Sequence, residues 1–277
     1  MGAAKESPRS RPREMENPRT YGSAPFTTVV VHGGPGAGGE MAPVARELAR
    51  SRGVLEPIQT AATLEGQVDE LKRLLEDHGD LPVTLIGFSW GAWLSFIVAA
   101  RCPEIVRKLI LIGSGPFEER YVAALQTARR GRLSEEERTE FEMIIAALGD
   151  PAAGDKSARL ARLGALASKT DTYDPIPDAS AEAERVDAQG DIFQGVWSDA
   201  AEMRKSGELL ALGERIKCPV VAIHGDYDPH PAEGVEKPLA AVIGDFRFIL
   251  LKRCGHKPWI ERQARDEFYR VLQRELG

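Results

Sequence analysis

Residues 81–100 read LPVTLIGFSWGAWLSFIVAA and contain no charged side chain. A membrane-spanning helix needs about 20 such residues. However, Pro82, Gly87 and Gly91 interrupt the stretch, and all three are unfavourable inside a helix. The same residues suit a buried parallel strand that turns sharply at Ser89 into a buried helix. We therefore predict a strand, a turn and a helix here, and no membrane span.

The rest of the chain alternates between apolar strands and amphipathic helices. Further strands are predicted where β-branched and aliphatic residues run together, at 27–31, 54–59, 106–115, 218–225 and 246–251. Further helices are predicted from the apolar spacing at 40–53, 64–79, 231–244 and 258–276. This alternation predicts an α/β fold, with a mostly parallel sheet and helices on both faces.

The chain divides into parts of different character. Residues 1–25 mix Pro, Ser, Arg and Glu without an apolar core, which predicts a disordered or loosely attached arm and not a secretion signal. Residues 26–116 and 216–277 carry the strand and helix pattern of the core. Residues 117–215 contain long polar helices and no convincing strand, so we expect a helical cap inserted between strands.

Composition limits the partners and the compartment. The 277 residues carry a net charge of −6 at pH 7, which gives no reason to expect nucleic acid or an anionic membrane as partner. Cys102, Cys218 and Cys254 are widely spaced and cannot close a disulfide framework, which suits a reducing compartment. We expect a cytoplasmic protein that acts on a small molecule; the sequence leaves its oligomeric state open.

The most distinctive motifs follow the predicted strands. They are HGGPG at 32–36, GFSWG at 87–91, HGDYD at 224–228 and CGH at 254–256. Parallel sheets bind ligands beyond the carboxyl ends of their strands, so these motifs are expected at one edge. GFSWG matches G-x-S-x-G, a strained turn that exposes a serine at the head of a helix. The helix N-terminus behind that serine favours a developing negative charge.

On these motifs the chain resembles the α/β-hydrolase family, from about residue 26 to the C-terminus. The family's order of nucleophile, acid and histidine matches Ser89, Asp228 and His256. The resemblance implies that Ser89 Oγ attacks a carbonyl carbon and that His256 takes its proton. It also implies that Asp228 orients the imidazole and stabilises the imidazolium.

The resemblance also implies an oxyanion hole. HGGPG resembles the family's oxyanion-hole loop, so the N–H groups of Gly34 and Trp90 are the expected donors. The residues expected to contact the substrate are His32, Gly33, Trp93 and Trp197. For the acid, Asp226 is an alternative to Asp228, but the family usually places it a few residues beyond the glycine that ends the strand.

Usual family members begin with an antiparallel hairpin before the HG strand. Here only residues 1–26, mostly polar, precede that strand. The resemblance therefore implies a sheet whose N-terminal edge strands are reduced.

Several functions stay open. HGGPG with Trp90 resembles the proline iminopeptidase branch, although GFSWG replaces the usual GGSWG. The acidic segment 170–184 suits either a site for a substrate amine or a solvated cap surface.

We expect a serine hydrolase that cleaves an ester or amide of a small molecule through an acyl-enzyme, like a carboxylesterase. A proline iminopeptidase-like aminopeptidase is the first alternative, and a non-catalytic binding protein of the same fold is the second. Dehalogenation is excluded, because it needs a carboxylate at position 89.

Two rival chemistries use the same loops. The glycines at 34, 36 and 39 fit a dinucleotide-binding fingerprint with Glu56 as its acidic residue. A continuous strand would also place four alternating metal ligands on one face, namely His224, Asp226, Asp228 and His230. The fingerprint leaves GFSWG unexplained, and Pro229 and Pro231 indicate that the strand has ended. We predict no cofactor and no metal.

Overall fold

The computed structural model describes residues 16–36, 38–150, 154–177 and 189–277. Its centre is a seven-stranded sheet in the order β1-β3-β2-β4-β5-β6-β7. The strands are β1 (Arg19–Tyr21), β2 (Thr28–Val31), β3 (Val54–Glu56), β4 (Val83–Phe88), β5 (Val106–Ile112), β6 (Val220–Gly225) and β7 (Phe246–Leu251). All neighbours are parallel except β1 and β3. The predicted mostly parallel sheet is confirmed.

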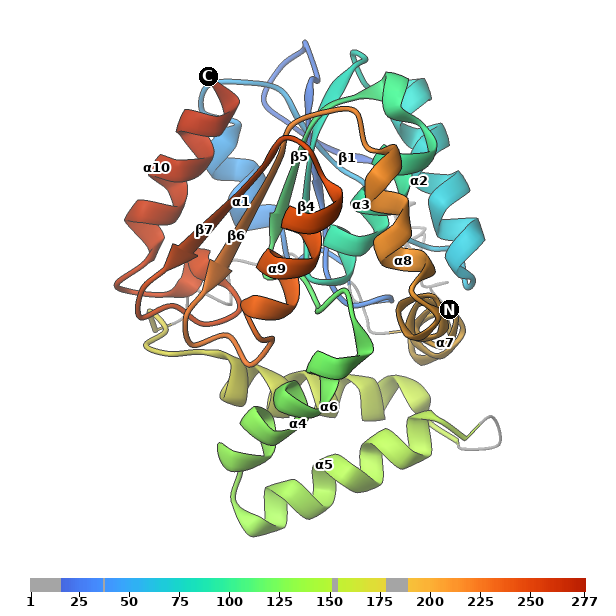
Figure 1. Ribbon diagram of the computed structural model, residues 1–277, viewed down its shortest axis with the longest axis vertical. Helices are drawn as coiled ribbons and strands as arrows, with labels where there is room; N and C mark the ends of the chain where they lie inside the picture. Colours follow the sequence, from blue (N-terminus) through green and yellow to red (C-terminus); the bar gives the residue numbers. More distant parts are fainter. Residues whose placement is uncertain (1–15, 37, 151–153, 178–188) are drawn as a thin grey trace, which may run out of the picture.

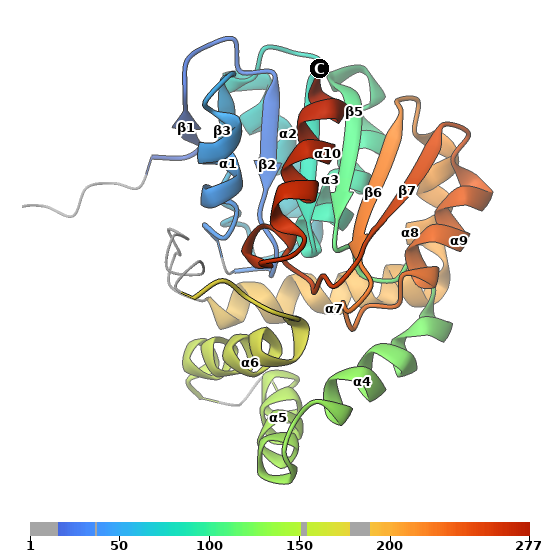
Figure 2. The ribbon, with the colours of Figure 1, turned by 90° about the vertical axis from the view of Figure 1, so that its left-hand side faces the viewer.

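Helices cover both faces of this sheet (Figures 1 and 2). One face packs against α1 (Ala42–Leu48) and α10 (Arg265–Leu276). The other packs against α2 (Leu64–His78), α3 (Trp90–Arg101), α8 (Glu208–Ala211) and α9 (Glu233–Val242). Short 3-10 turns are η1 (Pro103–Ile105), η2 (Glu119–Tyr121), η4 (Leu212–Arg215) and η5 (Pro258–Ile260).

Successive side chains of the central strands point to opposite faces of the sheet and so contribute to two separate hydrophobic cores. In β2, Val29 and Val31 enter the core under α2 and α3, whereas Val30 enters the core under α1 and α10. Leu85 and Ile86 of β4 divide in the same way. Both faces are buried, so these strands are apolar at almost every position.

Four helices lie beyond the carboxyl ends of the strands (Figure 2), and we call them the cap. They are α4 (Val122–Gly131), α5 (Glu135–Leu148), α6 (Lys156–Asp171) and α7 (Gly190–Ser206). Helices α5 and α6 share a small apolar core, whereas Val196 and Ala200 of α7 join the core under the sheet. All four fall within the residues where the sequence predicted an inserted helical cap, 117–215.

The N-terminal edge of the sheet differs from the predicted arm. Of residues 1–25, only those from 16 onward are among the described residues. Strand β1 pairs antiparallel with β3, and the Asn17 side chain exchanges two 2.9 Å hydrogen bonds with the backbone of Ile58. The described end of the expected arm is therefore part of the sheet, as one short edge strand. The apolar pattern did not predict β1, because an edge strand needs little apolar surface and these residues are mostly polar.

The stretch at 81–100 forms a strand and a helix. Strand β4 ends at Phe88 and α3 begins at Trp90, with Ser89 between them. Among the described residues, no helix is long and apolar enough to cross a membrane.

A substitution at Gly91 can test the packing of this turn. A Cβ there would lie 2.3 Å from the carbonyl oxygen of Val31 and 2.4 Å from that of His32, and backbone atoms cannot rotate away. We expect Gly91→Ala to lower the free energy of unfolding by about 3 kcal/mol or more. Gly164 of α6 is the control, because a Cβ there meets nothing within 4 Å. Gly164→Ala should raise stability by about 0.5–1 kcal/mol. Thermal unfolding checks both, and an unchanged Gly91→Ala melting temperature would contradict this account of the turn.

Candidate active site

Ser89 occupies a strained turn between β4 and α3. Its backbone has φ 53° and ψ −115°, a conformation that costs a non-glycine residue about 1–3 kcal/mol. The flanking glycines make the turn possible. A Cβ on Gly87 would lie 2.2 Å from the Gly91 carbonyl oxygen, and Gly91 itself packs on the backbone after β2. The Ser89 N–H donates to the Ile112 carbonyl oxygen at 2.9 Å, which fixes the turn to the end of β5.

Asp228 and His256 meet at the same edge. Nδ1 of His256 lies 2.7 Å from Oδ2 of Asp228, whose side chain is fully buried. Burial alone would raise the pKa of Asp228, but the neighbouring imidazoles of His256, His230 and His224 hold that pKa well below its usual range. The carboxylate is therefore ionised at neutral pH and can stabilise a protonated His256.

The imidazole lies beside the serine turn. Its ring centroid is 4.8 Å from that of Phe88, the residue before Ser89. Gly113, which follows Ile112, packs closely against His256: a Cβ there would be 3.0 Å from Nδ1. The described contacts do not include a hydrogen bond between Ser89 Oγ and His256. Such bonds are often long without substrate and tighten during reaction.

Asp226, the alternative acid, faces elsewhere. Its carboxylate accepts a 3.3 Å hydrogen bond from the Cys254 N–H and lies 3.8 Å from Lys252 Nζ. The structure brings Asp228, and not Asp226, to His256.

A second imidazole shares the Asp228 carboxylate, a feature that the sequence argument missed. Nδ1 of His230 lies 2.7 Å from Oδ1, and the His230 backbone N–H donates to the same oxygen at 2.9 Å. Burial lowers the pKa of His230 to about 4, so the ring is neutral and Nδ1–H is the donor. The alternation of histidine and aspartate in HGDYDPH, residues 224–230, is the sequence signal for this contact.

The geometry favours this hydrogen-bonded arrangement over a metal centre. Donor atoms of Asp228, His230 and His256 lie within 4.8 Å of one another. However, the two rings are stacked, with centroids 4.5 Å apart and an interplanar angle of 27°, and each Nδ1 faces a different oxygen. Nearly parallel rings direct their Nδ1 atoms along separate lines, whereas zinc ligands converge on one point.

The HGGPG loop lies against the serine turn. A Cβ on Gly33 would be 2.9 Å from the Phe88 ring and 3.1 Å from Ser89 Cβ, and Gly34 has φ +42°. Trp90 is the first residue of α3, so its N–H is among those without an intrahelical partner. Trp90 follows Ser89 in the chain, and Gly34 follows Gly33, which packs on Ser89. Their role as an oxyanion hole stays a prediction.

His32 corrects an expectation. It was a candidate substrate contact, but it is fully buried and the chain uses both ring nitrogens. Nδ1 donates to the Gly33 carbonyl oxygen at 2.8 Å, and Nε2 accepts the Gln59 N–H at 3.1 Å. Burial lowers the pKa of His32, which keeps it neutral for this pairing. His32 therefore fixes the shape of the loop.

Trp93 and Trp197 link the core to the cap. Their rings are stacked, with centroids 5.8 Å apart and an interplanar angle of 4°. Trp93 is fully buried and donates from Nε1 to the Gly115 carbonyl oxygen, which is a packing role. Trp197 on α7 is 38% exposed, so it is the member of the pair that can face a ligand.

The dinucleotide alternative does not fit this loop. A Cβ on Gly36 would be 2.4 Å from the carbonyl oxygen of Gln189, the residue before α7, so the start of α7 packs directly on this glycine. Glu56, the acidic residue of that fingerprint, is fully buried and accepts a 2.7 Å hydrogen bond from Tyr21 Oη. It is not presented to a ribose.

A separate hollow of about 640 Å³ lies along α5 of the cap, next to Arg159 of α6. It is lined by Glu135, Glu136, Thr139, Glu140, Met143, Ile144, Ala147 and Arg159. None of the residues of the serine site contributes to it.

Sequence comparison agrees with this geometry. The family described as the alpha/beta hydrolase fold matches residues 29–262. The chain belongs to the α/β hydrolase fold family. The pimeloyl-[acyl-carrier protein] methyl ester esterase of Chromobacterium violaceum is 24% identical over 271 residues, covering 93% of this chain and 96% of the relative.

Solved structures give the same fold for this α/β hydrolase. VinJ superposes with a TM-score of 0.63 at 21% identity, covering 93% of each chain. The proline iminopeptidase of Mycobacterium smegmatis superposes with a TM-score of 0.61 at 18% identity, also covering 93% of each chain. These neighbours show the same fold, and the family match makes the chain a member of a hydrolase family.

The two aspartates provide a test of the acid. We expect Asp228→Asn to lower turnover by about 10⁴-fold, because the imidazole would be held in the wrong tautomer. Asp226→Asn removes a weak backbone contact and a long, exposed ion pair with Lys252, and should change turnover little. Steady-state kinetics on a p-nitrophenyl ester compares them; equal, mild losses would place the acid elsewhere.

Proposed function

We propose that this α/β hydrolase cleaves an ester bond of a small molecule through an acyl-enzyme on Ser89. The observation that carries the proposal is the position of Ser89: it stands at a strained turn, at the sheet edge where Asp228 is bonded to His256 at 2.7 Å. A serine held in a costly backbone conformation beside a carboxylate–imidazole pair is suited to nucleophilic catalysis.

The proposed reaction uses these groups in sequence. Ser89 Oγ attacks the ester carbonyl carbon while Nε2 of His256, the nitrogen not bonded to Asp228, takes its proton. The N–H groups of Gly34 and Trp90 stabilise the oxyanion. His256 then returns the proton to the leaving alcohol, which departs as the acyl-enzyme forms. Water, activated by His256 in the same way, releases the acid and restores Ser89.

The cap favours an uncharged substrate over an N-terminal amine. An aminopeptidase needs a free carboxylate to hold the ammonium group, because an unpaired buried charge is very costly. In the described part of the acidic segment 170–184, Asp171 is bonded to Arg129, and Asp174 lies 3.5 Å from Arg262. Residues 178–184 of that segment lie outside the described residues. Both described carboxylates of this segment are already paired, which favours an ester.

Two further observations support ester cleavage. The Chromobacterium violaceum relative is named a methyl ester esterase. The exposed face of Trp197 and its stacking partner Phe193, with ring centroids 6.0 Å apart, offer an apolar wall on α7. Such a wall suits a short or medium acyl or aryl group. Proline iminopeptidase activity is the second candidate, favoured by the HGGPG loop and by the structural neighbour of that name.

Active-site labelling tests the nucleophile. We expect a fluorophosphonate probe to label the wild-type protein and not Ser89→Ala, since the probe reacts with an activated serine hydroxyl. Ser95, on the next turns of α3, is the control because it is fully buried. Ser95→Ala should label like the wild type. Labelling that survives Ser89→Ala would refute the nucleophile assignment.

Substrate preference separates the two candidate functions. We expect p-nitrophenyl esters with short acyl chains to be cleaved with a higher kcat/KM than prolyl or alanyl arylamides. A preference for prolyl arylamide by more than about tenfold, or ~1.4 kcal/mol of transition-state stabilisation, would instead support the aminopeptidase.

A further inference from the structure

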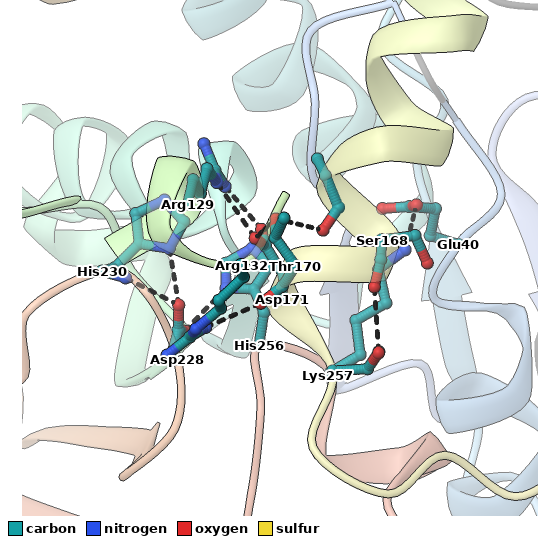
Figure 3. Close-up of polar contacts among 12 residues, drawn as sticks. Glu40, Arg129, Arg132, Ser168, Thr170, Asp171, Asp228, His230, His256 and Lys257 are labelled. Carbon is teal, nitrogen blue, oxygen red and sulfur yellow. Dashed lines mark hydrogen bonds and ion pairs between the residues drawn. The ribbon is translucent and has the colours of Figure 1, made fainter. Parts of the chain in front are cut away.

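An ion pair of the cap lies directly beside the candidate catalytic histidine (Figure 3). Arg129, near the end of α4, forms a two-pronged contact with Asp171, at the end of α6. Nε lies 3.0 Å from Oδ1 and Nη2 lies 2.5 Å from Oδ2. The two side chains are only 20% and 7% exposed. Burial would raise the pKa of Asp171, but the Arg129 guanidinium outweighs it and lowers that pKa, so the pair is charged.

Asp171 also holds the histidine loop through its backbone. Its carbonyl oxygen accepts the His256 N–H at 2.7 Å. Gly255 packs so closely on this carbonyl that a Cβ there would lie 2.2 Å away. The residue that Arg129 fixes by its side chain therefore sets the position of His256 by its main chain.

A buried carboxylate strengthens the same junction. Glu261 is fully buried and accepts three backbone N–H groups: those of Gly255, Tyr173 and Asp174, at 3.0, 2.8 and 2.8 Å. It thus ties the cap segment after α6 to the histidine loop. Backbone hydrogen bonds therefore connect the end of α6 and the segment after it to the loop that carries His256.

Charged groups around His256 come from several elements. They are Asp228 of the β6–α9 loop, Asp171, Arg129 and Arg132 of the cap, Lys257 with its partner Glu40, and Glu261. The neutral His230 ring stacks on His256, and Nε2 of His224 lies 3.6 Å from Oδ2 of Asp228. The Arg129–Asp171 pair contributes no net charge while both members are present. Removal of one member would leave a single, poorly solvated charge near the imidazole.

We propose that Arg129 and Asp171 are a positioning pair for His256, which fixes the histidine loop to the cap and keeps the charge beside the imidazole balanced. The inference rests on the proposed function, since it assumes that His256 is the general base. Through this pair, the packing of α4 and α6 controls the geometry of the base, so the cap takes part in catalysis without touching the substrate at this point.

If the pair keeps the charge beside the imidazole balanced, removing one of its charges should shift the pH profile of the enzyme. Asp171→Asn leaves Arg129 positively charged, which disfavours protonation of the imidazole. We expect the acid limb of log kcat/KM to move to lower pH by roughly 0.5–1 unit. Arg129→Gln leaves the carboxylate unpaired and should move the limb to higher pH. The double variant removes both charges and should return the limb to its wild-type position.

If the pair positions His256, disturbing its geometry should lower kcat without moving the acid limb of the pH profile. Arg129→Lys keeps both charges but loses the planar fork, so kcat should fall by about tenfold or more while the acid limb stays in place. The matched control is the Arg162–Glu140 pair of α5 and α6, which has the same two-pronged geometry, at 2.7 and 2.6 Å, on the exposed side of the cap. Glu140→Gln should change neither quantity.

The assay is the pH dependence of p-nitrophenyl ester cleavage, with circular dichroism to verify folding of each variant. An unmoved acid limb in folded Asp171→Asn, or unchanged kcat in Arg129→Lys, would overturn the proposal. Ser89→Ala in the same assay distinguishes a failure of the proposed function from a failure of the positioning pair. If it abolishes cleavage while Asp171→Asn behaves as wild type, only the positioning pair is refuted. If it retains cleavage, the proposed function falls and the positioning role falls with it.

Discussion

The close approach of three backbone segments at Gly87 and Gly91 is the constraint on which the site depends. Strand β4, the start of α3 and the loop after β2 come within contact distance there, and no side chain can be added at either glycine without a collision. This packing forces the chain through a conformation at Ser89 that a serine would otherwise avoid. The surrounding core of apolar strands and α3 supplies the stability that offsets this strain.

The proposed acid, Asp228, and the proposed base, His256, depend on this frame through burial. Asp228 is held at both carboxylate oxygens, by His256 on one side and by His230 on the other. A carboxylate removed from water needs such donors, because an unpaired buried charge would be neutralised or would destabilise the fold. His230 therefore keeps the acid ionised and fixed while His256 remains available for proton transfer.

The cap is joined to the catalytic edge at its α6 end and not merely laid over it. Asp171 and Glu261 connect the segment after α6 to the histidine loop through backbone hydrogen bonds. Motions that admit substrate are then expected at other parts of the cap, since opening this junction would expose buried charges. The proposed esterase would thus combine a fixed base with an apolar wall on α7, which the core also holds in place.

The sequence by itself determined the parallel part of the sheet, the serine turn and the order of the candidate reactive residues, but not the edge strand β1. Apolar runs such as VTLIGF and the glycines around Ser89 act locally, so strand, turn and helix could be predicted without a structure. The shorter α10 was not predicted, because Glu261 serves the cap and Pro258–Ile260 form a 3-10 turn before the helix begins at Arg265. Tertiary structure alone decided that His230 shares Asp228, that His32 shapes a loop, and that Arg129 reaches Asp171. These contacts join residues on different elements, and the composition of a segment does not record which distant partner will satisfy a buried polar group.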